Sequence, residues 1–277
     1  MKQISKQKLP PKNTRLLWWA RLIYGFVALN ALVGALILIL LPGQTDTLFF
    51  WTINPPLNAR LFGVLYLGGA AAVFLAVWRN EWEPVRYLVP ILVAAGILIS
   101  WVTLLHLDNF APGIRTVYWL VIYIGAPLLA LLIYGFQERQ GANWTVAVPV
   151  RPFTRRVALV TGSVVSLVAV GMIMWPETAV AHWPWPTSPL MVRIFAAWFG
   201  AFGLGLLWFR VERDWQRLRQ IPTLMIAAAG LDLLMVLLHW ETLSDTGLTL
   251  WLYGGHLLAF VAVGLLLHWY QRRPFPH

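Results

Sequence analysis

The sequence has no cysteine and very little charge. None of its 277 residues is Cys, and only 12% are Asp, Glu, Lys or Arg. The lack of cysteine excludes a disulfide framework, a thiolate nucleophile and a thiolate metal site. The scarcity of charge, with 59% hydrophobic residues and a mean hydropathy of +0.68, is far from the composition of a soluble domain. The chain is therefore expected to be an integral membrane protein.

Signatures of enzymes are also missing from the sequence. It contains no Gly-x-Ser-x-Gly nucleophile motif, no phosphate-binding glycine loop and no cluster of acids inside the apolar runs. The sequence therefore favours a non-enzymatic function.

Apolar runs long enough to cross the roughly 30 Å of hydrocarbon dominate the chain. They lie at about 17–41, 60–78, 85–106, 116–136, 155–175, 193–210, 221–240 and 250–270. Each is apolar around its whole circumference, which inside a bilayer is compatible only with a helix. The predicted fold is an all-α polytopic membrane protein with eight transmembrane helices.

The net charge of +10 comes from short Lys and Arg clusters between the apolar runs. With the N-terminus in the cytoplasm, 18 of these residues fall on the cytoplasmic side and 3 on the other. This asymmetry follows the positive-inside rule, so the charge reflects topology and does not indicate a nucleic-acid partner. We expect both termini to be cytoplasmic and the membrane to be the plasma membrane.

An internal repeat is visible at an offset of 133 residues. The offset superposes Arg60 on Arg193, Phe62 on Phe195, Trp82 on Trp215, Arg86 on Arg219, and Leu104-Leu105-His106 on Leu237-Leu238-His239. So many distinctive matches at one offset indicate a tandem duplication. Because each unit has four spans, both units enter the membrane from the same side. A pseudo-two-fold axis along the membrane normal should then relate them.

The duplication divides the chain into five segments. Residues 1–16 form a basic cytoplasmic segment, 17–136 the first four-helix repeat and 137–154 a cytoplasmic connector. The second repeat covers 155–270, and 271–277 form a cytoplasmic tail.

Small residues at four-residue spacing in the second and sixth spans predict that these two helices are the most crowded. Gly125-Ala126-Pro127 should kink the fourth span.

Polar residues at the outward ends of the spans belong to the repeat. They are Arg60, His106 and Asp108 in the first half and Arg193, His239 and Glu241 in the second. Charges at helix ends reach headgroups or water at little cost. We expect them to be structural, with each arginine pairing with an acid across neighbouring helix ends.

Two other polar residues break the repeat. Asp232 superposes on Ile99, and His256 superposes on Ile124 at a local offset of 132. An acid at membrane depth is costly and usually has a partner or a function. Asp232 and His256 on adjacent antiparallel spans, with Asn30, therefore form a candidate ligand or proton site. The alternative is a hydrogen-bonded cluster, including Asn30 or Tyr253, that only joins helices.

The sequence leaves several functions open. Our first interpretation is a protein that binds an apolar or amphipathic small molecule, or a membrane-protein partner, through its outward half. The proline- and tryptophan-rich outer loops are either interfacial caps or lids over such a ligand. One alternative is a proton-coupled transporter that uses Asp232. Another is a subunit that binds haem or a divalent metal through His239 and His256, although no metal-binding motif is present and no cofactor is predicted. The lipid bilayer is the expected surrounding.

Overall fold

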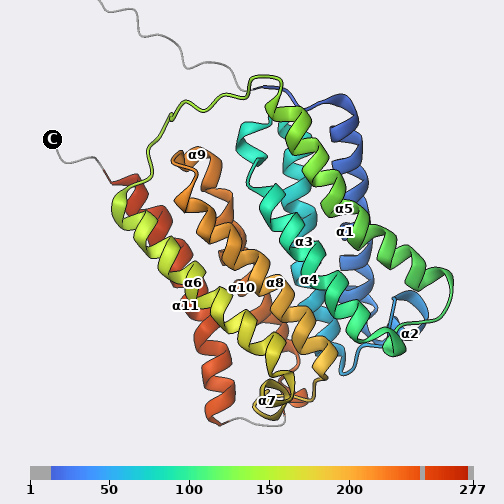
Figure 1. Ribbon diagram of the computed structural model, residues 1–277. Helices are drawn as coiled ribbons and strands as arrows, with labels where there is room; N and C mark the ends of the chain where they lie inside the picture. Colours follow the sequence, from blue (N-terminus) through green and yellow to red (C-terminus); the bar gives the residue numbers. More distant parts are fainter. Residues whose placement is uncertain (1–13, 244–246, 274–277) are drawn as a thin grey trace, which may run out of the picture.

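The computed structural model describes residues 14–243 and 247–273, and these residues form helices, turns and loops without a β-strand. Eight segments are helical, long and apolar enough to cross a membrane, which confirms the predicted number. The long helices are α1 (Trp18–Leu40), α3 (Pro56–Arg79), α4 (Leu88–Leu105), α5 (Ile114–Glu138), α6 (Pro152–Met174), α8 (Pro189–Leu207), α10 (Gln220–Leu238) and α11 (Leu248–Arg272) (Figure 1). The protein is an integral membrane protein.

Short helices complete the connections between the long ones. They are α2 (Thr45–Leu48), α7 (Pro176–Ala181) and α9 (Trp215–Leu218). The end of the bundle with α2 and α7 is called the loop end, and the end that carries residues 139–151 is called the connector end (Figure 1). Most of the basic N-terminal segment predicted at 1–16 and of the tail predicted at 271–277 lies outside the described residues.

Helices α3 and α8 begin earlier than their apolar runs. Each starts with a proline, Pro56 or Pro189, at its first position, where the fixed φ of proline fits a helix and its missing N–H is not needed. Ser188 caps α8 by accepting a hydrogen bond from Met191 N at 3.2 Å. As a result, Arg60 and Arg193 lie in the second turn of these helices and do not begin them.

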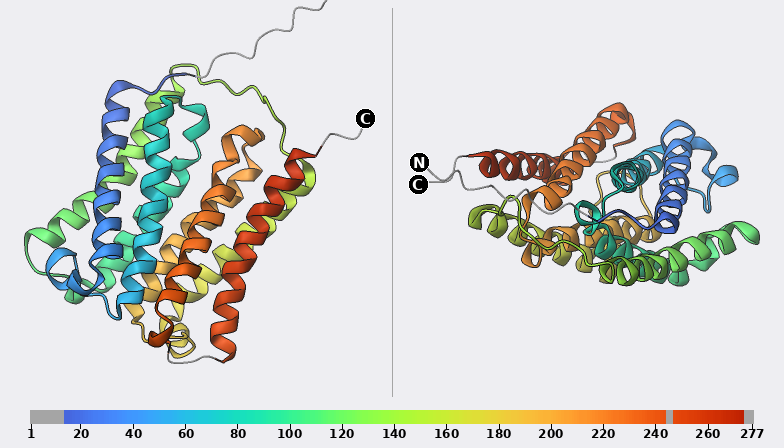
Figure 2. Two further views of the ribbon diagram at one scale, coloured as in Figure 1. Left: turned by 180° about the vertical axis from the view of Figure 1, so that it is seen from behind. Right: turned by 90° about the horizontal axis from the view of Figure 1, so that it is seen from above.

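The two halves of the chain interlock. Within the halves, α1 packs on α3, α4 on α5, α6 on α8 and α10 on α11. Between the halves, α4 packs on α8, and α10 packs on α3. The first helix pair of each half is thus completed by the second pair of the other half, as the views in Figure 2 show. Neither set of four helices forms a separate bundle.

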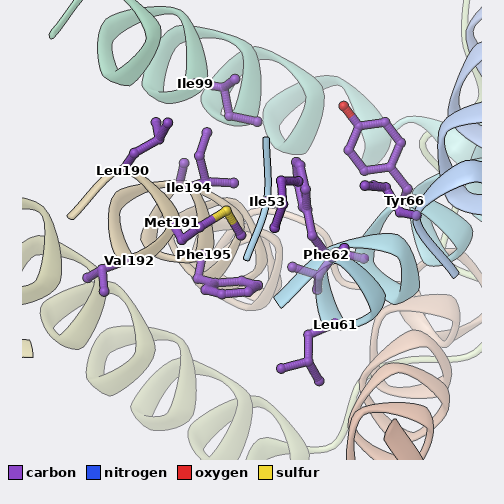
Figure 3. Close-up of a cluster of buried hydrophobic side chains, with 14 of the residues drawn as sticks. Ile53, Leu61, Phe62, Tyr66, Ile99, Leu190, Met191, Val192, Ile194 and Phe195 are labelled. Atoms are coloured by element: carbon purple, nitrogen blue, oxygen red, sulfur yellow. The ribbon is translucent and has the colours of Figure 1, made fainter. Parts of the chain in front are cut away.

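Helices α3 and α8 are the most buried of the eight, as their small residues predicted. Near the loop end, Phe62 of α3 and Phe195 of α8 lie in one cluster with Met191, Ile194 and Ile99 (Figure 3). All five side chains are buried. This cluster and a second one around Trp82 and Trp215 at the connector end form the core.

The connector that joins the halves is held along its length. Asp214, which precedes α9, accepts hydrogen bonds from the backbone N–H groups of Ala147 at 2.8 Å and Val148 at 3.3 Å. Arg217 Nη2 donates to the carbonyl oxygens of Asn143 at 2.9 Å and Thr145 at 2.8 Å. Asp214 and Arg217 are buried, so these hydrogen bonds attach the largely exposed connector to α9.

Candidate functional site: an apolar cavity open to the side

A cavity of about 320 Å³ lies among α1, α3, α4, α5, α8 and α10. Its walls are almost entirely aliphatic and aromatic, and small residues such as Gly68 and Ala72 of α3 leave room at its centre. Small-molecule pockets in proteins span about 300–1,000 Å³ and have predominantly apolar walls. The cavity has the size and the chemistry of a site for one small apolar molecule.

One side of the cavity is bounded by α5, which contains a proline. Pro127 interrupts the hydrogen bonding of α5, and its ring packs against Gly96 of α4, where an added Cβ would lie 2.0 Å from Pro127 Cγ. Figures 1 and 2 show the first turns of α5 leaning away from the bundle, which agrees with the predicted kink. The second half has no proline at the equivalent position. Ala259 superposes on Pro127 at the offset of 132 residues, and its helix α11 packs against α6.

Two contacts between α1 and α5 frame the cavity. At the connector end, the rings of Trp19 and Phe136 meet edge to face with centroids 5.7 Å apart. Towards the loop end, Tyr118 Oη donates a hydrogen bond to Asn30 Oδ1, while Asn30 Nδ2 donates to the carbonyl oxygen of Phe26 at 2.9 Å. Side chains of both helices line the cavity between and beside these contacts.

The exposed residues of the cavity wall lie near the Asn30–Tyr118 hydrogen bond. The lining residues Val33, Leu48 and Tyr118 are 48%, 42% and 41% exposed. Val33 lies seven residues before the end of α1, or about 10 Å along the helix axis. Val33 and Tyr118, which are both exposed, therefore place this part of the cavity wall on the flank of the bundle between α1 and α5.

Polar groups in the cavity wall mostly satisfy one another. The hydroxyls of Tyr66 and Tyr123 form a hydrogen bond between α3 and α5, and Tyr87 Oη donates to Gln220 Oε1 at 2.5 Å. The exception is Trp198 of α8, whose buried Nε1 has no hydrogen-bond partner in the described part of the chain. The wall therefore presents few free polar groups to a ligand.

One of the two proline- and tryptophan-rich loops at the loop end contributes to the cavity wall. Phe49 and Phe50, which follow α2, are part of its lining, and Trp51 packs edge to face on Trp119 with centroids 5.1 Å apart. In the second half, Trp183 and Trp185 pack on Tyr253, with centroids 5.7 and 4.8 Å apart. Neither Trp183 nor Trp185 lines the cavity. That the first loop is a lid over a ligand stays a prediction, and the two tryptophans of the second loop do not contact this cavity.

No protein-family model, curated protein or solved structure matches the chain.

Of the three residues predicted to form a ligand or proton site, Asn30 lies at a different cavity from Asp232 and His256. Asn30 lies at the mouth of the large cavity. Asp232 lines a second cavity of about 20 Å³ between α8, α10 and α11, and its Oδ1 is buried without a hydrogen-bond partner among the described residues. His256 lies on α11, and its ring packs on Phe199 with centroids 6.1 Å apart.

Asp232 and His256 approach the same side chains without bonding to each other. No hydrogen bond or ion pair joins them within residues 14–243 and 247–273, although Phe199 and Phe260 both line the Asp232 cavity and pack against the imidazole. His256 Nε2 is also buried without a partner there. A shared ligand or proton site at Asp232 and His256 therefore stays a prediction.

The repeated polar residues pair differently from the expectation. Arg60 Nη1 lies 3.2 Å from His239 Nε2, and Arg193 Nη1 lies 2.8 Å from His106 Nε2. Both arginines thus donate to a histidine of the other half. The acids Asp108 and Glu241 are exposed, and none of the ion pairs found in the described residues includes them. The predicted pairing of arginine with acid was wrong because the exposed acids remain accessible to solvent or headgroups.

The surroundings of His106 disfavour its charged form. Burial first, and then the adjacent guanidinium of Arg193, lower the pKa of His106 below its usual value, and Glu177 opposes part of this effect. A neutral His106 keeps Nε2 free to accept the hydrogen bond from Arg193.

The described residues contain no group of three or more His, Asp or Glu side chains that could hold a metal ion. Both ring nitrogens of His239 are already engaged, because Nδ1 lies 2.9 Å from the carbonyl oxygen of Met235 and Nε2 lies near Arg60. A metal or haem iron at His239 would have to displace one of these partners.

Several residues that shape the site gave no signal in the sequence. Tyr66 and Tyr123 lie in apolar runs, where aromatic residues are common, and Gly96 is one of many glycines. Outside the cavity wall, Asn58 of α3 is fully buried at the loop end and accepts a hydrogen bond from Trp185 Nε1 at 2.8 Å. Its two neighbours in the sequence, Leu57 and Ala59, gave no reason to single it out. Only the spatial arrangement reveals these roles.

Proposed function

We propose that the protein binds one apolar or amphipathic small molecule, taken from the bilayer, in the cavity among α1, α3, α4, α5, α8 and α10. The observation that carries this proposal is an apolar cavity of about 320 Å³ whose mouth lies between α1 and α5. Transfer of apolar surface from water is not the driving force here, since a bilayer is already apolar. Affinity comes from shape and from the few polar groups of the wall.

The arrangement of polar groups supports an amphipathic ligand. Asn30 and Tyr118 stand at the mouth, and the free Nε1–H of Trp198 belongs to a residue of the wall. A ligand oxygen that accepts from this indole would complete its hydrogen bonding. The body of the ligand then contacts aliphatic side chains and the ring of Trp119.

The proposed membrane arrangement follows the sequence. The halves are a tandem duplication with a pseudo-two-fold axis along the membrane normal, and both termini are cytoplasmic, with the loop end facing outward. The reciprocal Arg60–His239 and Arg193–His106 contacts support the duplication, because a two-fold axis relates the first contact to the second. The distribution of Lys and Arg supports the orientation in the plasma membrane.

The test is to fill the cavity with a larger side chain and to measure whether ligand binding is lost. Gly68 lines it, and a Cβ at this position meets no atom within 4 Å, so Gly68→Leu places a side chain in the ligand space. Gly135→Leu is the matched control, because Gly135 is exposed on α5, is not part of the wall, and also has nothing within 4 Å of an added Cβ.

The measurement is a mass-spectrometric inventory of small molecules that co-purify with each protein, followed by a binding assay. In phosphatidylcholine nanodiscs, 1-bromododecane should quench tryptophan fluorescence with a saturable component from Trp119 and Trp198 at the cavity. We expect Gly68→Leu to lose both the co-purifying molecule and this component, and Gly135→Leu to keep them. Equal inventories and equal saturable quenching in all three proteins would contradict the proposal.

A further inference from the structure

Asp232 has surroundings that suit a cation. The residue is 7% exposed on α10, six residues before the end of that helix, and Oδ1 has no hydrogen-bond partner in the described chain. None of the ion pairs between described residues includes it. A carboxylate buried at this depth is several kcal/mol too costly to remain ionised without a compensating positive charge. No cationic side chain of the described residues supplies that charge in an ion pair.

The cavity beside Asp232 is small and aromatic. Its volume is about 20 Å³, and three of its wall residues are Phe199, Phe202 and Phe260. A carboxylate combined with aromatic rings is the chemistry that recognises an ammonium group, through a charge-assisted hydrogen bond and cation–π contacts. A space of about 10–15 Å³ is needed to hold one water molecule, so a group of that size fits and a trimethylammonium group does not.

This small cavity adjoins the large one. Leu65 of α3 and Phe202 of α8 belong to the walls of both. On α10, Ile221 and Leu224 line the large cavity, while Met225 begins the wall of the small one. The two cavities therefore share part of their walls, and Phe202 belongs to the shared part.

We propose that Asp232 and the phenylalanine rings around it form a subsite for a primary ammonium group, so that the ligand of the large cavity is a lipophilic primary amine. The hydrocarbon chain lies in the large cavity, and the –NH₃⁺ group passes Phe202 and donates to the Asp232 carboxylate. This inference rests on the proposed function and adds the chemical class of the ligand. It also gives a role to Asp232, which the repeat does not explain.

The experiment compares three ligands with the same chain. Dodecylamine, dodecanol and dodecyltrimethylammonium, at equal mole fractions in phosphatidylcholine nanodiscs, compete with 1-bromododecane for the saturable quenching. Dodecylamine should compete about tenfold better than dodecanol, because a hydrogen bond to a charged group is worth at least the tenfold step in affinity. Dodecyltrimethylammonium should gain nothing over dodecanol. The comparison of dodecyltrimethylammonium with dodecanol needs no variant. It distinguishes a subsite that admits only a small ammonium group from a general attraction of cations.

The variants then locate the effect. Asp232→Asn keeps the volume of the side chain and removes its charge, so it should make dodecylamine equal to dodecanol while dodecanol binding stays as it was. Glu241→Gln, at an exposed acid, is the matched control and should keep the preference for the amine. Phe202→Ala, which removes a side chain shared by the two walls, should strengthen amine binding.

The outcomes distinguish the two proposals. If the amine and the alcohol compete equally in the wild type, or if the trimethylammonium compound competes as well as the amine, the ammonium subsite is wrong while the cavity function stands. The same holds if Asp232→Asn retains the preference for the amine. If no ligand competes and Gly68→Leu changes nothing, the cavity function itself is wrong and the subsite with it.

Discussion

Arg193, in the second half of the chain, donates from Nη1 to Nε2 of His106 in the first half across 2.8 Å. The residues that superpose on this pair, Arg60 and His239, form the reciprocal contact at 3.2 Å with the roles of the halves exchanged. Arg193 Nε also donates to the carbonyl oxygen of Ile173 at 3.1 Å. The two contacts fasten α8 to the end of α4 and α3 to the end of α10.

A double-mutant cycle should show that each pair is energetically coupled. Replacing Arg193, His106 or both with Ala should give a coupling free energy of about 1–2 kcal/mol, since hydrogen bonds from charged groups are stronger than neutral ones. The Arg60 and His239 cycle should give a similar value. The measurement is chemical or thermal unfolding in detergent, followed by tryptophan fluorescence.

Arg115 provides the control for these cycles. It donates to the backbone carbonyl oxygens of Asp46, Thr47 and Phe49, so Arg115→Ala combined with His106→Ala should show additive costs. Additivity in the Arg193 and His106 cycle as well would mean that the contact contributes nothing to stability.

Acid should destabilise the protein through His106. Because burial and Arg193 lower the pKa of His106 in the folded state, the unfolded chain binds a proton more readily than the folded one does. Stability is therefore highest above the ordinary histidine pKa of about 6.5 and falls as the pH drops from there towards the lowered value. His106→Gln, which retains an acceptor for Arg193 but does not titrate, should lose less stability between pH 7.5 and 5. Parallel pH profiles for the two proteins would contradict this.

The positions of the membrane helices were predictable because crossing a bilayer requires a long apolar run, and that requirement acts on each segment separately. Hydropathy does not predict how the polar residues at the helix ends pair. Arg60 was expected at the start of a helix beside an acid, but Pro56 begins α3 one turn earlier, and the partner is His239. This partner comes from the interlocking of the halves, a long-range property that hydropathy does not contain.

The candidate site was predictable only in part. Asn30 was predicted to share a site with Asp232 and His256, but it lines the large cavity, whose wall contains neither of the other two residues. The cavity itself depends on how Pro127 meets Gly96 across two helices, which requires the register between α4 and α5. The separation of Asp232 from Asn30 likewise depends on which helices pack together, and no local pattern gives that.

Asn58 should prove one of the most sensitive positions in the loop end. Its Nδ2 donates to the carbonyl oxygens of Asn54 at 2.8 Å and Pro186 at 3.1 Å, and its Oδ1 accepts from Trp185. Asn58→Ala leaves these buried groups unpaired, at a cost of about 1–3 kcal/mol for each group that stays dry. The unfolding temperature should fall strongly, and proteolytic cleavage within residues 182–189 should increase. The exposed Asn109→Ala should leave both unchanged.

Arg217 should hold the connector in place. It is buried, its Nη1 lies 3.5 Å from Glu212 Oε1, and its Nη2 binds two connector carbonyl oxygens. Arg217→Met should cost about 3 kcal/mol, because it leaves the buried carboxylate without this partner, and should make residues 139–151 sensitive to protease. Arg213→Met, at an exposed neighbour, is the control. Equal cleavage of both variants would show that the ion pair does not secure the connector.

The contact between Gly96 and Pro127 should decide whether the cavity exists. A Cβ on Gly96 would lie 2.0 Å from Pro127 Cγ and 3.0 Å from the carbonyl oxygen of Tyr123, so Gly96→Ala forces α4 and α5 apart. Overpacking of this kind costs about 1–3 kcal/mol. Pro127→Ala removes the ring and restores an N–H to α5, which should straighten the helix towards α1 and reduce the cavity.

The two substitutions should therefore compensate in stability but not in binding. Gly96→Ala combined with Pro127→Ala should unfold at a higher temperature than Gly96→Ala alone, because the ring that the new methyl group meets is gone. Saturable quenching by 1-bromododecane should nevertheless be weakened in Pro127→Ala and in the double variant, since both let α5 close on α1. The control is Gly254→Ala, on α11, where an added Cβ meets nothing within 4 Å. Unchanged quenching in Pro127→Ala would show that the bend in α5 does not create the ligand space.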